Sequence, residues 1–179
     1  LVVKLLTITD PMGRYAEHRR VKALGGVEVY YYQGTHFIAE VEAELVQRMR
    51  EFLGCSQVEV RLLSGQMANA TVFSGLVDYL NRADRRRESK RLGSVMNPQM
   101  GKGGHLSEQP MGALRDYVSM DPVTERRAVV NFPVLPGNPY QIDLVRTEAL
   151  INEHRPELII LGKSMILYRE PVKQLSRML

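Results

Sequence analysis

The residues best suited to chemistry stand where a β-prone run, residues 58–63, gives way to a helical pattern at Gln66. Ser64 and Gly65 break the run, and the first N–H groups of a helix have no acceptor within it. These N–H groups and the positive end of the helix dipole attract anions. Gly65 allows a close backbone approach, and the Ser64 hydroxyl adds a donor. The stretch predicts a phosphate site, with an ordinary strand–turn–helix joint capped by Ser64 as the structural alternative.

A second glycine-rich stretch, residues 101–104, leads to His105. An imidazole ring is flat and can transfer protons near neutral pH, although a histidine after two glycines is otherwise a loop residue. Ser164 follows residues 157–161, whose pattern is typical of a buried parallel strand. Because ligands bind at the carboxyl ends of strands in open α/β sheets, we expect Ser64, His105 and Ser164 on the same side of the sheet.

Strand-like and helix-like segments alternate along the chain, which predicts an α/β fold with a mostly parallel sheet covered on both faces. The strand candidates are residues 58–63, 92–96, 128–134 and 157–161. The helix candidates are residues 36–53, 66–80, 106–115, 143–154 and 171–179. The first helix should start after Thr35 as N-cap, pack its apolar face on the sheet and end at Gly54. Residues 1–8 should form a short strand or an arm.

An ordered set of motifs resembles serine hydroxymethyltransferase, a fold-type-I family that depends on pyridoxal 5'-phosphate (PLP). The matching motifs are Tyr15-Ala16-Glu17, Tyr32-Gln33-Gly34 with Val41-Glu42, Ser64-Gly65-Gln66-Met67-Ala68-Asn69, Gly103-Gly104-His105-Leu106-Ser107, and His154-Arg155-Pro156 with Ile159-Ile160-Leu161-Gly162-Lys163-Ser164. The resemblance implies a three-layer sandwich, a partial large domain of the aspartate aminotransferase-like PLP transferases, over residues 36–179.

The resemblance also implies roles for the site residues. Ser64, Gly65 and Gln66 would hold the cofactor phosphate, with Gln66 standing where many members have a second serine. His105 would stack on the pyridine ring and act in catalysis. Ser164 would lie near the phenolic oxygen of the cofactor.

By the same resemblance, residues 1–35 would form an N-terminal arm that crosses to the partner subunit of a homodimer. Tyr15, Glu17 and Tyr32 would bind the amino-acid substrate there, and Glu17 and Tyr32 would serve catalysis. The structural alternatives are a solvated surface segment and buried strand aromatics. The sequence departs from the family between Glu17 and Tyr30, where it has extra residues, and Tyr30 replaces an arginine.

The family moves a one-carbon unit between serine and tetrahydrofolate, giving glycine, and we expect this activity of the whole protein. The family's Asp-x-x-His and Schiff-base lysine are missing up to Leu179, and neither Lys102 nor Lys163 stands in that lysine's context. We therefore expect the chain to be part of a longer protein that, taken alone, binds PLP weakly and does not cleave serine. The alternatives are a PLP-dependent aldolase of the same fold and a non-catalytic ligand-binding or interaction module.

Composition sets wider limits. The 179 residues are 44% hydrophobic and 25% charged, as in soluble globular domains. Cys55 is the sole cysteine, which excludes an internal disulfide and fits a reducing, cytoplasmic location. No apolar run reaches transmembrane length, and we expect neither membrane nor metal binding. The net charge of +4 gathers at residues 82–91, and the absence of interleaved aromatic residues favours a solvated loop over a nucleic-acid patch.

Overall fold

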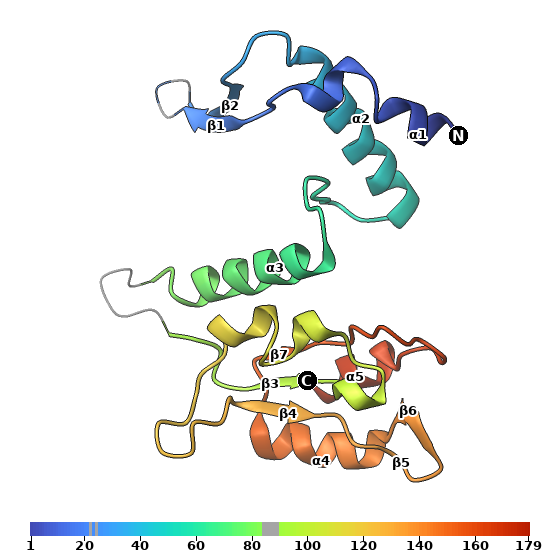
Figure 1. Ribbon diagram of the computed structural model, residues 1–179. Coiled ribbons are helices and arrows are strands. Elements are labelled where there is room, and N and C mark those ends of the chain that lie inside the picture. The colour runs from blue at the N-terminus through green and yellow to red at the C-terminus, as the bar shows by residue number, and fades with distance from the viewer. Residues whose placement is uncertain (22, 24, 84–89) are drawn as a thin grey trace. The chain divides into compact units, whose positions relative to one another are not determined.

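The computed structural model describes residues 1–21, 23, 25–83 and 90–179, in two compact units, Leu1–Arg61 and Leu62–Leu179 (Figure 1). Most of the basic loop predicted at residues 82–91 lies outside the described residues. The predicted division of the chain at residue 35 stays a prediction.

Unit 1 begins with helix α1, Val2–Leu6, and a 3-10 turn, Asp10–Gly13. Of the two alternatives for residues 1–8, a strand or an arm, the strand is wrong, because the segment satisfies its own backbone locally, as in the bond from Leu5 N–H to Leu1 O. Strands β1, His18–Val21, and β2, Val27–Tyr30, form an antiparallel hairpin.

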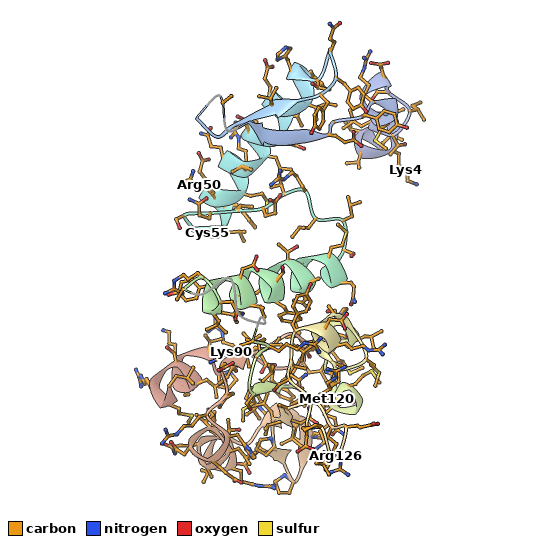
Figure 2. All side chains as sticks on the ribbon, turned by 90° about the vertical axis from the view of Figure 1, so that its left-hand side faces the viewer. Lys4, Arg50, Cys55, Lys90, Met120 and Arg126 are labelled. Carbon is orange, nitrogen blue, oxygen red and sulfur yellow. The ribbon has the colours of Figure 1, made fainter. Side chains whose placement is uncertain are left out.

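Helix α2, His36–Leu53, begins after Thr35 and ends at Gly54, whose φ of 64° is left-handed, as predicted. The Thr35 hydroxyl does not cap the helix but donates to Tyr32 O, 2.8 Å away. No residue of α2 is buried, so the expected packing of its apolar face on a sheet is not found within unit 1. Figure 2 shows side chains such as Arg50 standing out from this helix.

The central sheet of unit 2 is parallel, as the sequence predicts, and has the order β4-β3-β7. Its strands are β3, Val95–Asn97, β4, Val129–Asn131, and β7, Leu158–Ile159. Val95 pairs with Val129 on one side and with Leu158 on the other. An antiparallel hairpin of β5, Val134–Leu135, and β6, Asn138–Ile142, was not predicted.

Neighbouring residues on each strand point to opposite faces, and this alternation gives the sheet two cores. Val95 faces a cluster with Phe73 of helix α3, Gly65–Leu80, and with Ala113 and Leu114 of a 3-10 turn. Met96 faces a second cluster with Ile151 of α4, Leu144–His154, and Leu175 of α5, Val172–Met178. Figure 1 shows α3 on one side of the sheet and α4 on the other, which makes a three-layer sandwich.

The helix predicted over residues 106–115 is wrong. The segment forms two separate 3-10 turns, Leu106–Glu108 and Ala113–Asp116. Pro110 holds the preceding Gln109 in an extended conformation, and Gly112 lets the chain fold back against Leu106, where a Cβ would lie 2.1 Å from the carbonyl oxygen. These turns place buried side chains directly beneath the loop that carries His105.

Candidate functional site

The first part of the candidate site is the N-terminus of α3. Ser64 is extended, with φ −155° and ψ 159°, and its Oγ accepts the Met67 N–H at 3.2 Å, so Ser64 caps the helix as the structural alternative to a phosphate site expects. Ser64, Gly65 and Gln66 are all exposed, and the N–H groups of the first helical turn have no acceptor inside the helix. A solvent-facing set of donors thus stands at the positive end of a helix of 16 residues.

The strand predicted just before this helix, residues 58–63, does not form. None of the described strands pairs with it, and its polar side chains turn to local partners. Glu59 and Arg61 form an ion pair at 2.6 Å, and the Arg61 bonds hold the pKa of Glu59 at about 2. The segment is extended chain at the junction of the two units.

The second part of the site is the glycine loop that delivers His105 to the start of α3. Gly104 is buried so closely against Pro98 that an added Cβ would lie 2.3 Å from its carbonyl oxygen, and Gly103 has φ 94°. Only glycine permits this path. His105 emerges with its Cε1 3.9 Å from the Cβ position of Gly65, so the two predicted motifs meet in space.

A short relay fixes the His105 ring. Asn69 of α3 donates to Ser107 Oγ at 2.6 Å, and that hydroxyl lies 2.6 Å from His105 Nδ1. The Ser107 N–H also reaches Nδ1, at 3.1 Å. Since Nδ1 accepts both bonds, the network assigns the neutral tautomer with its proton on Nε2.

The third part of the site is the chain after β7. The Ser164 N–H donates to Gly103 O at 2.9 Å, and Lys163 forms an antiparallel bridge with Gly104. The loops after β3 and β7 both leave the carboxyl ends of parallel strands, so His105 and Ser164 lie at the same edge of the sheet, as expected. Ser164 is exposed and stands beyond the strand end at Ile159, not at it as predicted.

Unit 1 brings its own candidate residues together. The rings of Tyr15 and Tyr32 lie 5.5 Å apart between centroids, beside a pocket of about 280 Å³. The Glu17 carboxylate accepts from the Tyr32 hydroxyl, and this bond and its charge raise the pKa of Tyr32. Tyr32 is 47% exposed, so the alternative of a buried strand aromatic is wrong for it. Tyr15 is 69% exposed, which agrees with its alternative of a solvated surface segment.

Glu108 was missed by the sequence reasoning. It is fully buried, and its Oε1 accepts the His105 N–H at 2.9 Å to complete a capping box with that residue. Burial outweighs its bonds and raises the pKa of Glu108 to about 7. The only sequence signal is the spacing of Glu108 three residues after His105.

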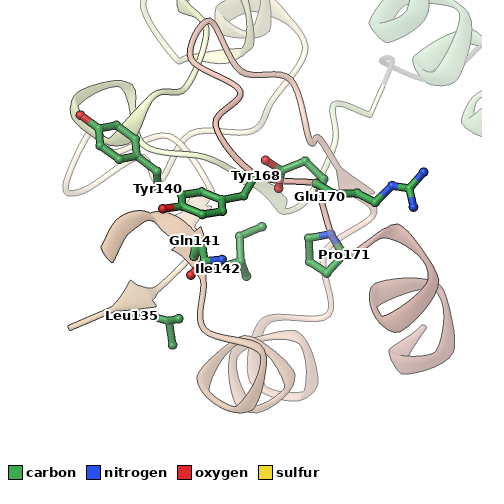
Figure 3. A pocket seen from close by; sticks show the side chains of 8 residues that line it. Leu135, Tyr140, Gln141, Ile142, Tyr168, Glu170 and Pro171 are labelled. Atoms are coloured by element: carbon green, nitrogen blue, oxygen red, sulfur yellow. The ribbon is translucent and has the colours of Figure 1, made fainter. Parts of the chain in front are cut away.

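A separate pocket of about 170 Å³ lies between the β5–β6 hairpin and the segment before α5 (Figure 3). Its lining includes Tyr140, Tyr168 and Glu170. Glu170 pairs with Lys163 at 2.6 Å, with side chains 14% and 4% exposed. None of the predicted site residues lines this pocket.

No helix in the described part is both long and apolar enough to cross a membrane. Nor do three or more His, Cys, Asp or Glu side chains gather there in a group that could hold a metal ion.

Comparison with known proteins gives the chain relatives, although no family model matches it. It is 30% identical over 175 residues to the serine hydroxymethyltransferase of Pyrobaculum arsenaticum and 32% identical over 175 residues to that of Pyrobaculum islandicum. Each match covers 98% of this chain and 34% of the relative. The protein of the same name from Korarchaeum cryptofilum is 29% identical over 94% of this chain and 37% of its own length.

The α/β architecture with its parallel sheet, together with these relatives, defines a fold-type-I PLP transferase domain. Within that class, the resemblance to serine hydroxymethyltransferase is confirmed, since relatives of that name match 98% of the chain. The chain spans about a third of the length of the relatives that it matches.

Proposed function

We propose that this chain carries the phosphate- and ring-binding part of a serine hydroxymethyltransferase-like enzyme, which uses PLP to interconvert serine and glycine with tetrahydrofolate. The observation that carries the proposal is the approach of His105 to Gly65 at the open N-terminus of α3. The motifs of Gly65 and His105 are 40 residues apart and follow each other in the order of the family. Together they supply an anion site and a flat ring at one place.

The donor set fits a phosphate ester. The first-turn N–H groups, including those of Gly65 and Gln66, have no helical acceptor, and an exposed helix N-terminus favours anions. Ser64 Oγ accepts from Met67 and still has its own proton to donate. A Cβ on Gly65 would stand in van der Waals contact with the His105 ring, so the glycine keeps that space open.

His105 would stack on the pyridine ring, with its orientation set by Ser107 and its transferable proton on Nε2. Ser164 would add a hydroxyl near the phenolic oxygen of the cofactor. When bound, PLP supplies an electron sink that weakens bonds at the amino-acid Cα. The contribution of this chain is to bind the phosphate, orient the ring and hold a proton at a defined nitrogen.

Tyr15, Glu17 and Tyr32 would bind the amino acid. Their grouping supports a shared role, because one carboxylate and two exposed phenol groups can meet the ammonium and hydroxyl groups of serine. We infer that they serve the partner subunit of a cytoplasmic homodimer, in which Glu17 and Tyr32 act in catalysis.

The test is a titration of the full 179-residue chain with PLP, followed by fluorescence and by isothermal calorimetry. We expect weak saturable binding that inorganic phosphate displaces and that His105→Ala reduces about tenfold. The matched control is His154→Ala, an exposed histidine at the end of α4, which should bind as the parent does. Binding that is indifferent to both phosphate and His105 would reject the proposed cofactor site.

A second measurement addresses the reaction. The chain is incubated with PLP and serine or allo-threonine, with and without tetrahydrofolate, and glycine is measured. We expect no turnover from the chain alone, and folate-dependent release of glycine from serine by a chain as long as the relatives that includes it. Release from allo-threonine alone would favour an aldolase, and no turnover by that longer chain would favour a ligand-binding module.

A further inference from the structure

Glu108 holds the backbone of the residue that we place over the cofactor ring. Its Oε1 accepts the His105 N–H at 2.9 Å, while the His105 ring is held separately through Ser107. Its own backbone carbonyl accepts from Asn97 at the end of β3. Glu108 is 0% exposed, so this carboxyl group is enclosed between the sheet and the His105 loop.

The second oxygen of the carboxyl group faces the other wall of the site. Oε2 is buried and has no hydrogen-bond partner among the residues that the structure describes. It would lie 2.8 Å from a Cβ on Gly162, two residues before Ser164. The Gly162 N–H is near enough to lower the carboxyl pKa, but it makes no well-formed bond to Oε2. One side chain therefore stands between the two segments that carry His105 and Ser164.

The charged groups around Glu108 do not compensate the negative charge that its ionised carboxylate would carry. Lys163 lowers its pKa, but that ammonium is committed to Glu170 at 2.6 Å and to Tyr140 O at 3.2 Å. Glu170 itself raises the pKa of Glu108. An ionised Glu108 would place negative charge on a buried oxygen without a partner, which is costly. A neutral Glu108 retains the acceptor for His105 and avoids that charge.

We propose that Glu108 is a positioning residue of the cofactor site, which holds the His105 loop and the Gly162–Ser164 segment in place when neutral and loosens them when ionised. The N–H groups of His105 and Gly162 stabilise an ionised Glu108 too little to offset its burial. Further stabilisation of the charge requires drawing Lys163 away from Glu170 or admitting water, and either change shifts the site walls. The positioning role rests on the proposed function, because His105 matters to a ligand only if the site binds one.

The first test needs no ligand. The His105 amide is followed by heteronuclear NMR in the full chain between about pH 5 and about pH 8.5, with the ring Cε1–H as a separate monitor of the imidazole. We expect an inflection near pH 7 in the amide that Glu108→Gln abolishes. The control, Glu148→Gln on the exposed face of α4, should retain it. An inflection that survives in Glu108→Gln and does not follow the ring Cε1–H, or its absence from the parent chain, overturns the proposal.

The second test uses PLP as the probe. Between about pH 6 and about pH 8, the affinity of the parent chain should fall about tenfold more than that of Glu108→Gln, since both share the titration of the cofactor phosphate. Gly162→Ala presses a methyl group on Oε2 and should weaken binding at both pH values, whereas Gly137→Ala, with nothing within 4 Å, should not. Equal pH dependence in parent and Glu108→Gln overturns the positioning role. Absence of PLP binding in every variant rejects the proposed function, and the NMR result then decides the coupling of Glu108 to His105.

Discussion

The Cε1 atom of His105 lies 3.9 Å from the point that a Cβ would occupy on Gly65. This distance is an ordinary van der Waals contact, so the fold has room for a methyl group at the start of α3. A ligand that lies between the helix N–H groups and the imidazole would need the same space as that methyl group. A substitution of Gly65 can therefore leave folding intact and still impair ligand binding.

Gly65→Ala should fold with unchanged or slightly higher stability, because alanine suits a helix better than glycine. Its PLP affinity should fall about tenfold, because the methyl group fills the space beside His105. The control is Gly75→Ala in the same helix, which meets nothing within 4 Å and should gain up to about 1 kcal/mol without a change in affinity. Thermal unfolding and calorimetric titration measure both effects. Equal affinities in the two variants would contradict the prediction.

Ser64 separates capping from anion binding. Ser64→Ala loses the acceptor for the Met67 N–H and should cost about 1 kcal/mol of unfolding free energy. Ser64→Asp should keep the cap but repel the phosphate, and so retain stability while losing PLP binding. Asp143→Ala removes the corresponding cap of α4 and should lose stability without losing binding. Chemical denaturation and PLP titration give the two readouts, and PLP binding by Ser64→Asp at the parent affinity would refute the assignment.

Ser107→Ala breaks the relay from Asn69 to His105. The Asn69 amide loses its acceptor, and the expected cost is about 1–3 kcal/mol of unfolding free energy, since Ser107 is only 1% exposed. The His105 ring should lose its preference for the tautomer protonated on Nε2, which nitrogen chemical shifts report. Ser119→Ala removes a hydroxyl bond to Gly93 O and is the control. If Ser107→Ala leaves the ring tautomer unchanged, the Ser107 hydroxyl does not determine the tautomer and the Ser107 N–H alone does.

Stability should depend on pH through Glu108. Its pKa rises from 4.5 for an exposed glutamate to about 7 in the fold, so the folded state holds the proton more tightly. The resulting stability is complete below about pH 4.5, is lost as pH rises to about 7, and amounts to at most about 3 kcal/mol. Urea unfolding at several pH values should show this slope in the parent chain and not in Glu108→Gln. A parent chain that gains stability over this interval would contradict the sign.

Local signals were enough for much of unit 2. The helix after Asp143 forms as predicted, and the cap at Ser64 forms as the structural alternative for that stretch expects; both follow from residue types at fixed spacing. The parallel sheet follows from the alternation of strand and helix patterns. The meeting of His105 with Gly65 required the family resemblance, because no local rule joins two loops 40 residues apart.

Other features depend on partners in space. Residues 58–63 have strand-like composition but no strand beside them, and β propensity reflects packing more than intrinsic preference. Residues 106–115 have an apolar spacing that suggested a helix, which Pro110 and Gly112 prevent. The burial of Glu108 arises only when the His105 loop closes over the sheet, so its sequence neighbours carry no sign of it.

The ion pair between Lys163 and Glu170 also governs the covalent reactivity of the chain. An amine adds to an aldehyde or an activated ester only when it is neutral and accessible, and the Lys163 side chain is 4% exposed beside a carboxylate. Lys90 and Lys173 are exposed and should be modified first. Lys163 should acquire a label only as fast as its segment opens. Its acylation rate therefore measures how fast the segment between β7 and α5 opens.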